Sequence, residues 1–81
     1  MIQTATQTSE IEEKIRATIA YADQTLNSII FRDLSNDARL QFNQARGFIQ
    51  QANDNLKARK YAFAALVANK AADIARLLAK G

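Results

Sequence analysis

Apolar residues recur at helical spacing over three stretches of the chain. The first series, joined by steps of three and four residues, is Ile11, Ile15, Ile19, Ala22, Leu26 and Ile29. The second series is Ala38, Phe42, Ala45, Ile49, Ala52 and Leu56. The third is Tyr61, Ala64 or Ala65, Ala68, Ala71 or Ala72, Ala75 and Leu78, widened by Leu66, Ile74 and Leu77. Residues three or four positions apart lie on one face of an α-helix. The pattern therefore predicts three amphipathic helices, at about residues 9–31, 36–57 and 61–80.

Local signals suggest where these helices begin and end. Ser9 is followed three residues later by Glu12, an arrangement typical of a capping box, so we expect the first helix to begin at Ser9 after a flexible tail at residues 1–8. Asp33, Ser35 and Asn36 offer capping side chains for the second helix, which predicts a turn before it.

The connections determine the topology. A basic stretch at residues 57–60 separates the second helix from the third. Because short connections place consecutive helices antiparallel, the sequence predicts an all-α, up-down-up three-helix bundle that forms a single domain at residues 9–81.

Alanine occupies many inward positions, so larger side chains must fill the core. We expect Phe42, Phe48, Phe63, Leu56 and the isoleucines of the first helix to supply that volume. The core is the expected place for all six aromatic side chains, with Phe31 and Phe48 the most exposed because neither lies on the apolar stripe of its helix. Gly47, inside the second helix, costs roughly 0.5–1 kcal/mol relative to alanine unless a neighbouring helix approaches closely there.

The composition argues against catalysis and metal binding. The 81 residues include no cysteine and no histidine, which removes thiolate nucleophiles, sulfur ligands and the commonest general base. Ser28 and Ser35 have no base at a readable spacing, and Asp33 and Asp37 are explained by helix capping. We therefore expect no enzyme, with no catalytic residue, no cofactor and no metal.

Positive charge is concentrated in the last third of the chain. Residues 56–81 carry six basic residues against Asp73, whereas residues 1–31 carry four acidic and two basic residues. Lys57, Arg59 and Lys60, with Lys70, are candidate contacts for nucleic acid or another anionic partner. The wide spacing of the basic residues favours a solvated surface over nucleic acid. No apolar run approaches the roughly 20 residues of a membrane span.

Two stretches resemble known helical proteins. The run Leu56-Lys57-Ala58-Arg59-Lys60-Tyr61-Ala62-Phe63-Ala64, followed by Ala68 and Ala71-Ala72, resembles the rhythm of tetratricopeptide-like hairpins. The longer stretch from Ala38 to Ala75, with Gln41-Phe42-x-Gln44-Ala45-Arg46 and Gln51-Ala52, is similar to alanine-rich helical regions of uncharacterised bacterial envelope proteins and lipoproteins. The second resemblance implies a bacterial module located in the envelope or periplasm.

These observations together predict a non-enzymatic interaction or structural module, part of a larger bacterial protein. Its expected partner is an unidentified protein, with Phe48, Phe63 and Leu66 as the candidate contact residues. Two alternatives stay open. One is a basic module that binds an anionic partner through the turn before the third helix. The other is a self-associating bundle, in which the alanine stripe of the third helix and the off-stripe residues Phe48, Phe63 and Leu66 pair with a second copy.

Overall fold

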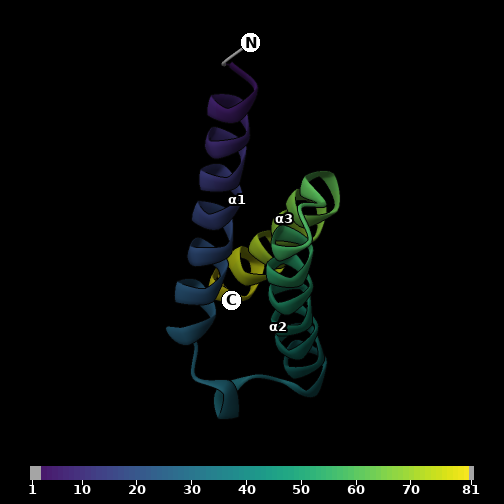
Figure 1. The fold of residues 1–81 in the computed structure, drawn as a ribbon. Coiled ribbons are helices and arrows are strands. Elements are labelled where there is room, and N and C mark those ends of the chain that lie inside the picture. Colours follow the sequence, from purple (N-terminus) through teal and green to yellow (C-terminus); the bar gives the residue numbers. More distant parts are fainter. Residues whose placement is uncertain (1–2, 81) are drawn as a thin grey trace.

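The bundle has three helices that run up, down and up. The structure, a computed structural model, describes residues 3–80, with side chains from residue 7 onward. Within that range the chain forms α1 (Gln3–Asn27), a 3-10 turn η1 (Phe31–Asp33), α2 (Asn36–Lys57) and α3 (Tyr61–Lys80), and no strand. Figure 1 shows α1 and α2 side by side in opposite directions, with α3 returning behind them. The predicted all-α three-helix bundle is confirmed.

The core lies where α3 packs into the space between the other two helices. Contact is most extensive between α2 and α3 and least extensive between α1 and α2. The buried residues of α1 and α2 are Ile15, Ile19, Ala22, Leu26, Ala45, Ile49, Ala52 and Leu56. On α3 they are Ala64, Ala68, Ala71, Ala72 and Ala75, all of them alanine. Small side chains on α3 allow the helices to approach closely, and no polar side chain is buried among the described residues.

The expected aromatic core is not found. None of the six aromatic side chains, all of which the structure describes, is fully buried, and Phe63 is 61% exposed. Phe42, Phe48 and Tyr61 pack against the edge of the core instead. The physical reason is the alanine face of α3, because closely spaced helices leave no room between them for an aromatic ring. The prediction that Phe63 supplies core volume was therefore wrong.

The first helix differs from its predicted bounds at both ends. It begins at Gln3 and ends at Asn27, so Ser9 lies inside a helix and residues 3–8 belong to α1, whereas residues 1–2 lie outside the described range. Ile11 is exposed although it lies on the predicted stripe. The Tyr61 hydroxyl at the start of α3 donates to Glu12 at 2.6 Å, so α3 begins beside the turn of α1 that contains Ile11.

After Asn27 the chain leaves the helix and folds over the end of the bundle. Ile30 is extended, and the ring of Phe31 packs edge-on against Phe42 at 5.2 Å between centroids. Arg39 of α2 holds this connection by donating to the carbonyl oxygens of Phe31 at 3.3 Å and Arg32 at 2.7 Å. These contacts replace the helical turns that the sequence predicts up to residue 31.

The ends of α2 and the start of α3 match the prediction. Ser35 is the N-cap of α2, and its hydroxyl accepts from the backbone N–H of Ala38 at 3.2 Å. At the other end the N–H of Arg59 donates to the carbonyl of Leu56 and that of Lys60 donates to the carbonyl of Asn55, at 3.0 and 2.8 Å. This pair of bonds is a Schellman motif, in which Arg59 takes the left-handed position with φ of 62°.

Candidate interaction surface on the third helix

The outward face of α3 carries a row of large apolar side chains. Phe63, Leu66 and Leu77 are 61%, 51% and 65% exposed. Successive helical residues are rotated by about 100°, so Leu66 and Leu77 lie nearly opposite the buried alanines of the same helix. Val67 and Ile74, both partly buried against the core, border this row. We call Phe63, Leu66, Lys70, Asp73 and Leu77 the α3 stripe.

Two charged residues occupy the middle of the α3 stripe. The ammonium group of Lys70 lies over the ring of Phe48 on α2, 5.7 Å from the ring centroid. The Oδ1 atom of Asp73 pairs with Nη2 of Arg76 at 3.2 Å, one turn further along α3. The stripe is therefore apolar towards both ends and carries one positive and one negative charge at its centre.

The structure separates the three candidate contact residues into two groups. Phe63 and Leu66 lie together on the α3 stripe, whereas Phe48 is on α2, partly buried and packed against the core. Leu77 belongs to the stripe but was read from the sequence only as part of a wider apolar face. The signal for it was present, because positions 63, 66, 70, 73 and 77 alternate steps of three and four residues, the spacing of a coiled-coil seam.

The candidate anion-binding residues do not form one cluster. Lys57, Arg59 and Lys60 are exposed at the turn between α2 and α3. Lys70 lies ten residues beyond Lys60, roughly 15 Å along the helix at 1.5 Å per residue, and it is engaged with Phe48.

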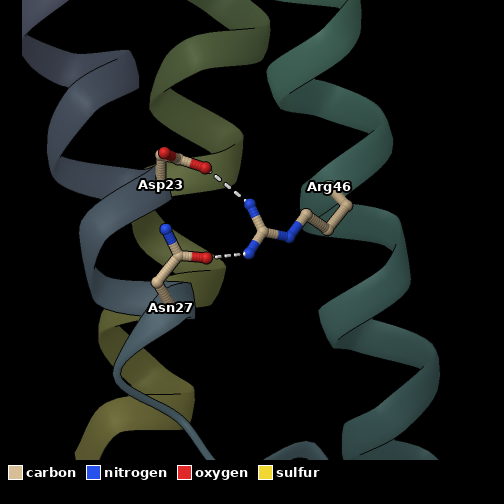
Figure 2. Close-up of polar contacts among 3 residues, drawn as sticks. All are labelled: Asp23, Asn27 and Arg46. Atoms are coloured by element: carbon tan, nitrogen blue, oxygen red, sulfur yellow. Dashed lines mark hydrogen bonds and ion pairs between the residues drawn. The ribbon is translucent and has the colours of Figure 1, made fainter.

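A polar bridge joins α1 and α2, the pair of helices with the least mutual contact. Arg46 of α2 donates from Nη1 to Oδ1 of Asp23 at 2.5 Å and from Nη2 to Oδ1 of Asn27, both on α1 (Figure 2). Its guanidinium also lies 5.4 Å from the centroid of the Phe42 ring. These side chains hold the two helices together at the surface, so we assign the bridge a structural role.

A shallow depression of about 590 Å³ lies between α1 and α3. Its polar lining residues are Thr18, Tyr21, Asn69, Asp73 and Arg76. A hydrogen bond with the Tyr21 hydroxyl and the adjacent Asp73 carboxylate raise the pKa of the Arg76 guanidinium above its ordinary value. Because Arg76 is paired with Oδ1 of Asp73, its guanidinium is not an unpaired cation that the depression offers to an anionic ligand.

Among residues 3–80, no group of three or more His, Cys, Asp or Glu side chains is placed to hold a metal ion. In the same range no helix has the length and apolar character needed to cross a membrane.

The likeness to tetratricopeptide-like hairpins and to bacterial envelope proteins stays a prediction. Comparisons with protein-family models, curated proteins and solved structures give no match to this chain.

Proposed function

We propose that this protein is a non-enzymatic interaction module that binds a protein partner through the α3 stripe. The observation that carries the proposal is the exposure by half or more of three large apolar side chains, Phe63, Leu66 and Leu77, on one face of one helix. Exposed apolar side chains gathered on one face are a feature of protein-binding sites.

The energetics favour burial of this face by another helix. Covering apolar area yields about 25 cal/mol per Å², so each of these side chains can contribute roughly 1 kcal/mol or more when a partner covers it. An amphipathic helix presents its own apolar residues at the same three-and-four spacing, which suits a row running along α3. Phe63 is the aromatic member of the row, and aromatic residues are common anchors in such contacts.

Leu40 provides a contrast within the same molecule. It is 69% exposed on α2, but the residues three and four positions away from it on that helix are Asn36, Asp37, Asn43 and Gln44. A single apolar side chain in polar surroundings is ordinary protein surface. Leu40 therefore serves as a control of matched chemistry and similar exposure.

Site-specific photo-crosslinking tests the proposal. Leu66 is replaced by p-benzoylphenylalanine in one protein and Leu40 in another, and each is irradiated in a lysate of the source organism. We expect defined protein adducts from position 66 that position 40 does not give. Identical adduct patterns from the two positions, or no adduct from position 66, contradict the proposal.

A further inference from the structure

We infer that the partner of the α3 stripe is a second copy of this chain, packed antiparallel about a two-fold axis that passes between Lys70 and Asp73. This inference rests on the proposed function, because it names the occupant of the same surface. It is carried by the order of charges along the stripe, which is complementary to itself only in one orientation and one register.

The spacing of the stripe fixes which residues meet. Positions 63, 70 and 77 form one set of a heptad seam, and positions 66, 73 and 80 form the other. In an antiparallel pair the two sets face each other, so Leu66 meets Leu77 of the second copy and Leu77 meets its Leu66. At each end, Phe63 meets the aliphatic stem of Lys80 of the second copy, which covers apolar surface while its ammonium group stays in water.

The central charges select this arrangement over the others. With the axis between them, Lys70 faces Asp73 of the second copy and Asp73 faces its Lys70, which gives two opposite-charge contacts. A parallel pair brings Lys70 against Lys70 and Asp73 against Asp73. An antiparallel pair centred on either residue also places like charges together, and like charges in contact disfavour an interface.

The contacts already present in the molecule are compatible with the pair. Arg76 contacts Oδ1 of Asp73, and Oδ2 of the same carboxylate can accept from Lys70 of the second copy. The ammonium group of Lys70 lies over the Phe48 ring of α2, and the flexible side chain of Lys70 can turn from that ring towards Asp73 of the second copy. Because the stripe points away from the buried alanines, a second α3 can approach without displacing α1 or α2.

The resulting dimer is weak. A stable interface of standard size takes about 800 Å² from each partner, roughly one seventh of the 5705 Å² surface of this molecule. One face of a single helix that has charged residues at its centre supplies less than that. We therefore expect dissociation constants in about the micromolar range or above, and binding that weakens as salt screens the central contacts.

Cysteine pairing tests the register on a clean background, because the sequence contains no cysteine. Leu66→Cys protein, carrying a mass tag, is mixed with Leu77→Cys protein under mild oxidation, and the mixed disulfide is measured by intact mass. The predicted register brings these two positions together, so the mixed species should exceed both homodimeric disulfides. A mixture of Leu40→Cys and Leu77→Cys proteins gives the collisional level. A mixed yield no higher than this control overturns the inference.

Charge exchange supplies a second test by sedimentation equilibrium. Lys70→Asp and Asp73→Lys each place like charges at both central contacts, and we expect each to weaken the dimer by about tenfold. The double variant restores opposite charges in reversed order and should recover dimerisation. A double variant no tighter than either single variant contradicts the inference, and thermal unfolding of each variant checks that the monomer still folds.

The outcomes separate this inference from the proposed function. If no paired disulfide exceeds the control while position 66 still captures a different protein in the lysate, the second copy is the wrong partner and the interaction module stands. If position 66 captures neither a second copy nor another protein, both fail.

Discussion

Replacement of Gly47 by alanine should stabilise the bundle, because the structure gives this glycine no packing role. Gly47 lies in the middle of α2, it is exposed, and no glycine in the described chain has a positive φ. A Cβ atom added at this position meets nothing within 4 Å. The close approach of a neighbouring helix, which could have explained a glycine here, is absent at this residue.

The magnitude follows from helix propensity alone. Alanine is favoured over glycine in a helix interior by about 0.8–1.0 kcal/mol, in part because glycine leaves the unfolded chain more conformational freedom. For a domain of this size each kcal/mol corresponds to about 4–8 °C in the melting temperature. We therefore expect Gly47→Ala to raise the melting temperature by several degrees.

Thermal and urea unfolding followed by circular dichroism at 222 nm measure this change. Gln50→Ala is the control, since it leaves the same alanine side chain at another exposed position of the same helix without replacing a glycine. We expect the control to change the free energy of unfolding by less than about 0.5 kcal/mol. A Gly47→Ala protein no more stable than the control would refute the reasoning, because a neighbouring group must then occupy the space that the structure leaves open.

Three further changes test other parts of the fold. Arg59→Gly should raise the free energy of unfolding, measured by urea titration, by about 0.5–1 kcal/mol, because glycine adopts the left-handed backbone conformation of this position without the steric cost of a Cβ atom. An unchanged or lower stability contradicts that backbone conformation. Ala52→Asp should cost at least about 3 kcal/mol by burying an unpaired charge, whereas exposed Gln51→Ala should be nearly neutral, and equal unfolding midpoints for the two would refute the assigned faces of α2. The hydrogen bond to Glu12 raises the pKa of the Tyr61 hydroxyl, together with desolvation and the negative charge of Glu12. The protonated hydroxyl therefore stabilises the fold below pH 10, and this stabilisation is lost as the pH rises through the raised pKa of Tyr61. Tyr61→Phe should unfold more readily at neutral pH and lose less stability between pH 9 and 11; parallel pH profiles of the two proteins count against the hydrogen bond.

The sequence alone predicted those parts of the fold that depend on capping residues and apolar spacing within one helix. Ser35 caps α2 as one of the predicted capping residues, and the basic stretch before α3 contains the turn. The inward stripe of α2 is also as predicted, with Ala45, Ile49 and Ala52 buried. Apolar periodicity and capping chemistry act within one helix, so they can be read without knowing its neighbours.

The first helix shows where local signals fail. A capping box at Ser9 stabilises a helix start but cannot prevent a helix from extending past it, and residues 3–8 contain neither glycine nor proline to end one. At the other end, Phe31 leaves the helical path to contact Phe42, a residue of another helix. Such a contact depends on tertiary structure, so a pattern within one helix could not reveal it.

The candidate surface was predictable only in part. Phe63 and Leu66 were recognised as contact residues, but the sequence also placed Phe63 in the core, because helical spacing alone does not give the distance between helices. The alanines of α3 allow the neighbouring helices to approach closely, so large aromatic rings lie at the edges of the core or on the outer face of α3. Leu77 was missed for the same reason, since its exposure depends on how much of α3 the other helices cover.

Amide NMR spectra recorded over a dilution series test most directly whether the α3 stripe is the contact surface. Spectra of the full chain are compared from about 1 mM to about 10 µM, a range that spans weak dissociation constants. We predict concentration-dependent shifts along α3 at Phe63, Leu66, Lys70, Asp73 and Leu77, with the amides around Arg46 on α2 unchanged. Spectra that do not change on dilution, or changes centred on the α1–α2 bridge, would contradict self-association through this face.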